Sequence, residues 1–170
     1  IPETPKTAKI KNHVIATNQN CLDAMKLRSN DLGYSTKLLD CLSGNVTDLG
    51  SIISKTFSDK KMNCVIFGGE STVVVTGKGK GGRNQELVLY TISDLSKKYK
   101  DVVVASVGTD GIDGSTDCAG AVLQSDQKPD SIKHYLDKND SHAFFKKYGG
   151  LIITGPTGTN LMDVGLVLRK

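Results

Sequence analysis

The sequence predicts an α/β fold, a layered domain with a mixed, largely parallel sheet flanked by helices. Apolar strand-like runs alternate with segments of helical periodicity, a pattern typical of strand-helix units whose parallel strands are covered on both faces. Most of the 18 glycines follow such runs, in clusters at residues 68–82, 108–120 and 149–165. Two strand-like runs meet at Gly68 and Gly69, which indicates that the sheet is mixed.

Length and composition favour one globular domain. A chain of 170 residues can bury a single core, and a content of 38% hydrophobic and 24% charged residues is typical of globular proteins. No apolar run approaches the roughly 20 residues that a membrane-spanning helix needs, and the N-terminal segment has no signal-peptide core. We therefore expect a cytoplasmic protein that does not enter a membrane.

A linker at residues 1–9, marked by two prolines among polar residues, precedes the predicted domain at residues 10–170. The expected elements in chain order are strand 12–17, helix 19–33, strand 34–40, helix 45–57, strands 62–70 and 71–77, helix 84–99, strand 101–111, helices 130–137 and 140–147, and strands 151–158 and 164–168.

The helices are predicted from capping residues and apolar spacing. Thr17 or Asn18 can cap the first helix, and Gly33 ends it. Spacings of three and four define the inner faces of the next two, which are Val46, Leu49, Ile52, Ile53 and Phe57, then Leu87, Tyr90, Thr91 and Leu95. Ser131, and then Asn139 or Asp140, are caps for the two short helices.

Net charge and aromatic content argue against a nucleic-acid partner. The net charge is only +4 and is spread along the chain, aromatic residues make up 5%, and tryptophan is absent. Nucleic-acid-binding proteins usually concentrate basic residues on one stripe. A small anionic ligand remains compatible with this composition.

The cysteines give no sign of a metal site or of disulfides. They stand at positions 21, 41, 64 and 118, without a C-x-x-C pair and with few histidines nearby to complete a zinc set. Cys64 lies in an apolar run and is predicted to be a small core residue.

The segment GKGKGGRNQE, residues 77–86, is a first candidate site. A glycine-rich turn that leads into a helix offers free amides and the positive end of the helix dipole, and Lys80 and Arg83 add cationic donors. The candidate anion-binding residues are Lys80, Gly81, Gly82, Arg83, Asn84 and Glu86. The segment matches no standard nucleotide fingerprint, so a flexible turn, with Glu86 capping the helix, remains an alternative.

Two further loops carry oxygen-rich side chains. Thr109, Asp110 and Asp113 follow a buried strand, where they could hold Mg²⁺ or orient a substrate hydroxyl, or form Asx-turns instead. The other loop offers Thr157, Gly158, Thr159 and Asn160 beside a proline that stiffens it, and a rigid turn is the alternative. Glu70, at a strand end, is a candidate site carboxylate or half of a salt bridge.

Four stretches of the chain together resemble a known family. They are KIKNHVIATNQNCLDAMK, GGESTVVVTGKGKGGRNQELVL, GTDGIDGSTDCAGAV and LIITGPTGTNLMDVGLVL. In this order they resemble the MOFRL domain, the C-terminal domain of class II glycerate 2-kinases, a family that also contains the TtuD-like hydroxypyruvate reductases. The resemblance covers nearly the whole chain.

The resemblance implies phosphoryl transfer from ATP to the 2-hydroxyl of D-glycerate with Mg²⁺, giving 2-phosphoglycerate. It also implies an active site between two α/β domains, where an N-terminal Rossmann-like kinase domain contributes a lysine and much of the substrate contact. This domain is absent from the chain, which we expect to be inactive alone.

By motif position, Arg83 would neutralise phosphate or bind the glycerate carboxylate, and Asp110 or Asp113 would orient Mg²⁺ or the hydroxyl. Residues 157–160 would bind phosphate or substrate. Alternatives are a free-standing module that binds a small anion or phosphometabolite, and a regulatory partner of a separate kinase half. A homo-oligomer is compatible with each.

Overall fold

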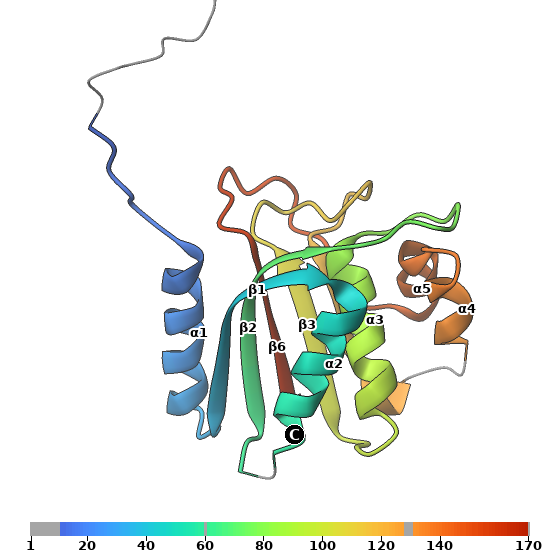
Figure 1. The fold of residues 1–170 in the computed structure, drawn as a ribbon, viewed down its shortest axis with the longest axis horizontal. Helices are drawn as coiled ribbons and strands as arrows, with labels where there is room; N and C mark the ends of the chain where they lie inside the picture. Colours follow the sequence, from blue (N-terminus) through green and yellow to red (C-terminus); the bar gives the residue numbers. More distant parts are fainter. Residues whose placement is uncertain (1–10, 60, 128–130, 170) are drawn as a thin grey trace, which may run out of the picture.

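The computed structural model describes residues 11–59, 61–127 and 131–169 (Figure 1). The linker predicted at residues 1–9 lies outside them. The elements are α1 (Asn18–Asp31), β1 (Thr36–Asn45), α2 (Val46–Phe57), β2 (Cys64–Thr72), α3 (Arg83–Leu95), β3 (Val102–Gly108), β4 (Gly120–Gln124), a 3₁₀ turn η1 (Ser125–Gln127), α4 (Ile132–Leu136), α5 (Ser141–Tyr148), β5 (Leu151–Ile152) and β6 (Asp163–Arg169).

The strands form one mixed sheet in the order β1-β2-β6-β3-β4-β5. This confirms the layered α/β prediction, but "largely parallel" is wrong for the pairings. Among the strands that the structure describes, only β1 and β2 pair in parallel, whereas β2–β6, β6–β3, β3–β4 and β4–β5 are antiparallel. Two of these antiparallel pairings arise because the last strand inserts between β2 and β3, and the other two arise because the unpredicted β4 returns beside β3. Strand-helix alternation along the sequence cannot reveal either arrangement.

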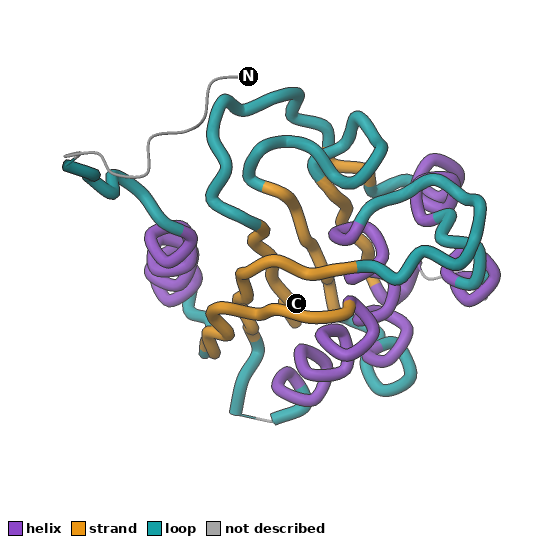
Figure 2. Tube along the Cα trace, turned by 45° about the horizontal axis from the view of Figure 1, so that its top comes forward, coloured by secondary structure: helices purple, strands orange, loops and turns teal. Residues whose placement is uncertain are grey.

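Helices cover both faces of the sheet (Figure 2). The two faces follow from the alternation of side chains along β2. Cys64 and Ile66 pack with Leu22 of α1, whereas Val65 and Phe67 join the larger core beneath α2 and α3. No helix within the described ranges combines the length and the apolar character needed to cross a membrane.

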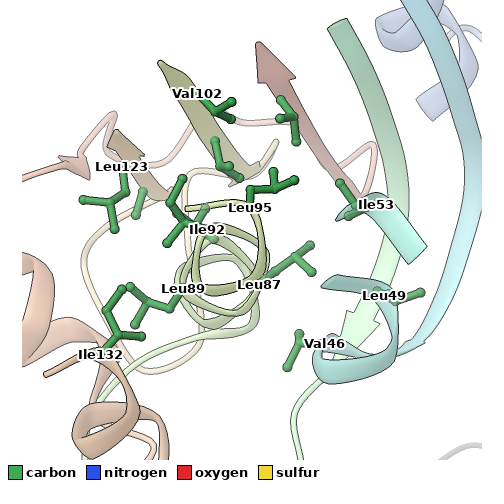
Figure 3. Packing of buried hydrophobic residues seen from close by; sticks show 14 of the residues in the cluster. Val46, Leu49, Ile53, Leu87, Leu89, Ile92, Leu95, Val102, Leu123 and Ile132 are labelled. Carbon is green, nitrogen blue, oxygen red and sulfur yellow. The ribbon is translucent and has the colours of Figure 1, made fainter. Parts of the chain in front are cut away.

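Helix α3 occupies the centre of the larger core. Leu87, Leu89, Ile92 and Leu95 are at most 3% exposed, and Figure 3 shows them pointing in several directions around the helix axis. Their neighbours come from α2, from β3 and β4, and from α4. Because α3 is surrounded in this way, the position of its first turn is fixed by the core.

Four predictions about elements are wrong. Residues 12–17 form no strand, and Val14 and Ile15 are 80% and 96% exposed. The predicted strand 71–77 ends at Thr72, where β2 ends, and the next residues run as an extended loop. In these two cases the β-branched residues have no strand beside them to pair with.

The predicted strand 151–158 is limited to β5, Leu151–Ile152, and continues as a loop. Ile52 of α2, expected on the inner face, is 44% exposed on the outer side of its helix.

Most other elements are confirmed. The helices α1, α2, α3, α4 and α5 lie where they were predicted, with Thr17, Ser131 and Asp140 preceding their first turns. Strand β4 was not predicted, because GAVLQ follows a polar, glycine-rich loop.

Candidate functional site

Three loops gather at one end of the sheet, beyond β2, beyond β3 and before β6 (Figure 1). Residues 77–82 after β2 are packed against the junction of α4 and α5. The amides of Thr76 and Gly77 donate to Asn139 Oδ1 at 2.8 Å, and the amide of Lys80 donates to Asp140 Oδ1 at 3.0 Å. These hydrogen bonds hold the backbone of the segment at several points, which favours a packed loop over the flexible-turn alternative.

The first turn of α3 is capped from inside the protein by Asp113. Its Oδ1 accepts from the Asn84 amide and its Oδ2 from the Gln85 amide, both at 2.9 Å, and the Asn84 and Gln85 side chains donate at 3.3 and 3.1 Å. Asp113 is 0% exposed. The dipole and amides predicted to bind an anion already hold this carboxylate.

This arrangement changes the roles predicted for two residues. Burial raises the pKa of Asp113, while the four N–H donors act in the opposite direction. With both oxygens engaged and no exposed surface, Asp113 does not fit a metal ligand or a substrate base. Asn84 is also 0% exposed, and it accepts from the Ser106 hydroxyl, so it holds the interior together and does not reach a ligand.

Arg83 pairs with Asp163, the first residue of β6. The guanidinium donates from Nε to Oδ2 at 2.6 Å and from an Nη to Oδ1 at 2.8 Å, a bidentate pair that raises the pKa of Arg83. The Arg83 side chain is 27% exposed and that of Asp163 is 8% exposed. The sequence prediction missed Asp163, although a carboxylate that heads a buried apolar strand calls for a cationic partner.

A pocket of about 380 Å³ lies beside Arg83. Four predicted site residues line it, namely Gly81, Gly82, Arg83 and Glu86. Glu86 is only 2% exposed, accepts from the Asn139 side chain at 3.1 Å, and has its pKa raised by burial. Ser71 Oγ is buried in the same wall without a hydrogen-bond partner among the described residues. The pocket therefore combines a cation, a buried carboxyl group and a buried hydroxyl without a partner among the described residues.

The loops after β3 and before β6 are hydrogen-bonded to each other beyond this pocket. Thr157 Oγ1 donates to the Thr109 carbonyl at 2.6 Å, and the Thr157 amide donates to the Asp110 carbonyl at 3.2 Å. The Leu161 amide donates to Thr109 Oγ1 at 2.7 Å. Residues 157–160 are exposed on this rim. We call residues 108–110 and 154–162 the rim loops.

Asp110, in the rim loop after β3, lies close to the Arg83–Asp163 pair. Its Oδ1 accepts from the Ile112 amide at 3.0 Å, which is an Asx-turn. A Cβ atom placed on Gly108 would lie 2.9 Å from Asp110 Oδ1 and 3.4 Å from Asp163 Oδ1, so the two carboxylates flank the same glycine. Asp110 is half-buried, in contrast to the fully buried Asp113.

The predicted site residues thus fall into distinct positions. Gly81, Gly82, Arg83 and Glu86 surround the pocket, and Thr109, Asp110 and Thr157 belong to the rim loops, with Gly158, Thr159 and Asn160 exposed at the rim. The side chains of Glu70 and Lys80 are exposed outside the pocket lining, and Asn84 and Asp113 are buried beneath it.

Sequence comparison agrees with this arrangement. A family model described as the MOFRL family matches residues 63–163, which contain β2, α3, the pocket and both rim loops. The chain belongs to the MOFRL family. The matched range ends at Asp163, the partner of Arg83, so the whole constellation lies within the MOFRL match.

Relatives of this MOFRL chain carry kinase names. It is 41% identical to a protein of Picrophilus torridus named glycerate 2-kinase, covering 95% of the chain and 40% of that protein. It is 37% identical to a Thermotoga maritima protein named D-glycerate 2-kinase, covering 99% of the chain and 44% of that protein. The chain therefore spans less than half the length of these relatives.

Comparison of structures gives the same relationship. The MOFRL chain superimposes on the crystal structure of a glycerate kinase from Thermotoga maritima with a TM-score of 0.85 and 34% sequence identity. The match covers 98% of the chain and 44% of that structure. The fold of the MOFRL chain is thus that of one part of a larger enzyme's structure.

Proposed function

We propose that the chain is the C-terminal domain of a glycerate 2-kinase, occupying residues 10–170, and that it requires the N-terminal kinase domain for turnover. The reaction is phosphoryl transfer from ATP to the 2-hydroxyl of D-glycerate, giving 2-phosphoglycerate. The observation that carries the proposal is the MOFRL match over 63–163, which encloses the pocket and the rim loops. The kinase names of the relatives support it.

The charges around the pocket support an incomplete kinase site. Arg83 is the cation that lines the pocket, and Asp163 already pairs with it. Glu86 and Asp163 add carboxylates, and Asp113 occupies the amides of α3. A triphosphate bound here would need further positive charge, because phosphoryl transfer depends on cations that neutralise the migrating group. The N-terminal kinase domain and Mg²⁺ would supply it.

The residues of the rim loops fit Mg²⁺ in one respect. Mg²⁺ prefers carboxylate oxygens and keeps several waters, so a half-buried carboxylate with a free oxygen suits it. Asp110 uses Oδ1 in its Asx-turn, and within the described residues Oδ2 makes no hydrogen bond. Asp110 would hold the ion, and Asp113 would not. When bound, Mg²⁺ would neutralise charge on the transferring phosphate.

The remaining roles follow from exposure. The exposed part of Arg83 would bind phosphate or the glycerate carboxylate while Asp163 fixes its orientation. From the rim, Gly158 would offer its backbone N–H, Thr159 its hydroxyl and Asn160 its side-chain amide to the substrate, while Thr157 holds the loop in place. Asp110 would orient the nucleophilic hydroxyl if it does not hold Mg²⁺. A cytoplasmic location and a homo-oligomer stay predictions.

The test is a chimera. The part of the Picrophilus torridus glycerate 2-kinase that this chain does not cover is joined to the chain, and ADP release is followed with D-glycerate, ATP and Mg²⁺. We expect turnover by the chimera and none by the chain alone. The matched control is the relative's own domain restored to the same junction. A folded chimera without turnover, beside an active control, would overturn the proposal.

The alternative is a free-standing module that binds a small anion. It predicts saturable binding of 2-phosphoglycerate or inorganic phosphate by the chain alone, measured by calorimetry. The pairing of Arg83 with Asp163 and the capping of α3 by Asp113 do not favour this alternative, because the first engages a cation and the second engages the N–H donors that an isolated anion site needs.

A further inference from the structure

A cysteine, a histidine and an aspartate meet outside the candidate site. Asp117 and Cys118 end the connection between β3 and β4, and His142 is the second residue of α5. One ligand atom from each lies within 4.8 Å of the other two. Cys118 Sγ lies 3.5 Å from Asp117 Oδ1 and 4.0 Å from His142 Nδ1. Cys118 and His142 are 24 positions apart in the sequence, which is why local sequence patterns do not reveal this group.

The spacing of these atoms suits a tetrahedral metal ion. Bonds of about 2.0–2.3 Å at tetrahedral angles place ligand atoms roughly 3.3–3.7 Å apart. The distance from sulfur to the carboxylate oxygen is already 3.5 Å, and the distance from sulfur to the imidazole nitrogen must shorten by only a few tenths of an ångström. The third distance, from the carboxylate oxygen to the imidazole nitrogen, is within 4.8 Å, and the Asp117 side chain that sets it is exposed.

The chemical nature of the three side-chain ligands indicates which metal ion they would bind. A thiolate with an imidazole favours Zn²⁺ or Co²⁺, whereas Mg²⁺ prefers ligands that are all oxygen. We propose that Asp117, Cys118 and His142 form a zinc-binding site with three protein ligands and water in the fourth position. Binding forms a bond from the ion to Cys118 Sγ, releases the thiol proton to solvent, and uses the lone pair of a neutral His142 ring.

The position of this zinc site gives it a structural consequence. It joins the loop that carries Asp110 and Asp113 to the first turn of α5. The His142 amide donates to the Lys80 carbonyl at 2.9 Å, so the same turn of α5 also holds the glycine segment 77–82. The ion would therefore fix the β3–β4 loop relative to the pocket wall, and its removal would loosen both.

The alternative is a local hydrogen-bond group without metal. Cys118 is buried and its thiol donates to Asp117. Hydrogen bonds from the Asp117 backbone amide and from this thiol lower the pKa of the Asp117 carboxyl group, with smaller contributions from the charges of His142 and Lys80. In this case hydrogen bonds and charge hold the three side chains together, and no metal is bound. The two possibilities differ in one observable, a metal–sulfur bond.

The test titrates the full chain, without a histidine tag and in a phosphine reductant, with Co²⁺ and then Zn²⁺. We expect a thiolate-to-cobalt charge-transfer band in the near ultraviolet that Zn²⁺ abolishes. At about 100 times its Kd, Zn²⁺ should raise the Tm by roughly 5–10 °C, and Mg²⁺ should leave it unchanged.

Matched variants locate the site. Cys118→Ser should abolish the cobalt band, and His142→Asn and Asp117→Asn should weaken zinc binding at least about tenfold. Cys41→Ser and His134→Asn change an exposed cysteine and an exposed histidine elsewhere and should bind like the wild type. Because Cys118 is buried, circular dichroism without metal checks that each variant folds. His142→Asn and Asp117→Asn keep the test valid if Cys118→Ser does not fold.

A wild-type chain without the cobalt band, a band that survives in folded Cys118→Ser, or an unchanged metal affinity in folded His142→Asn would overturn the proposal. A band lost in Cys41→Ser would overturn it too, because binding would then occur at the exposed thiol. The zinc titration involves no turnover, so its result is independent of the glycerate 2-kinase proposal.

Discussion

The two glycine-rich segments of the site contain glycine for different physical reasons. In the segment 77–82 the backbone packs so closely against its neighbours that a side chain would not fit at the glycine positions, and a Cβ on Gly82 would lie 2.3 Å from Asp113 Cγ. In the rim loop before β6, Gly158 has open space around it and a φ of +74°. The first segment uses glycine for close approach, and the second uses it for a left-handed turn.

The segment 77–82, which we call the wall, and the rim loop before β6 therefore play different parts in the site. The packed segment forms part of the pocket wall, and its amides are hydrogen-bonded to the α4–α5 junction. The open rim exposes its hydroxyl and amide groups at positions 157–160. Changes in the wall should therefore act on folding first, and changes in the rim should act on ligands first.

The largest stability effect is expected in the wall. Gly82→Ala should lower the free energy of unfolding by about 3 kcal/mol, because the new methyl group displaces the buried Asp113 and uncaps α3. Urea unfolding followed by circular dichroism measures it. A loss below about 1 kcal/mol would show that the wall can relax, and the contrast with the rim would fail.

The next largest loss of stability is expected at Asp113, and Asp110 in the same loop provides the comparison. Asp113→Asn should cost about 2 kcal/mol, because the new amide cannot accept from all four N–H donors. Asp110→Asn is the matched control and should cost less than about 0.5 kcal/mol. Thermal unfolding of both variants measures the difference, and equal losses would remove the distinction between a buried cap and a ligand-facing carboxylate.

Substitution in the rim should cost less. Gly158→Ala places a Cβ in open space but forces it into a left-handed conformation, for an expected loss of about 1 kcal/mol. Its free energy of unfolding is compared directly with that of Gly82→Ala. A loss as large as in the wall variant would show that the rim loop is as tightly constrained as the wall.

The smallest effect is a pH dependence from Glu86 in the pocket. Burial raises its pKa above the ordinary value of 4.5, so above this pH the native state holds a proton that the unfolded chain has lost. The free energy of unfolding of the wild type should therefore fall, relative to Glu86→Gln, as pH rises from 4.5 through the raised pKa. Urea titrations at a series of pH values measure the difference, and a constant difference would show that the carboxyl group is not destabilised by burial.

Local patterns in the sequence predicted most of the helices and the glycine-rich strand ends. Capping residues such as Thr17 and apolar spacing along α2 depend on neighbours within one turn, so they are visible in the chain itself. The insertion of β6 between β2 and β3 depends on pairs that are 94–104 residues apart for β2 and 55–67 residues apart for β3, so it could not be predicted in this way.

The candidate site was predicted in composition and only partly in roles. Arg83 and Glu86 line the pocket as expected, but Asp113 looked equivalent to Asp110 in the sequence. What separates them is burial and the nearby amides of α3, which belong to another segment. Asp163 was missed for the same reason, because its partner lies 80 residues away.

The most direct test of the central claim is the turnover number of the chimera with Asp110→Asn. Asp110 is preferred to Arg83 for this test, because removing Arg83 would leave the buried Asp163 unpaired and would confuse stability with activity. We expect kcat for ADP release with D-glycerate to fall about 100-fold or more, with a Tm within about one degree of the unsubstituted chimera. A wild-type kcat in this folded variant would contradict the account.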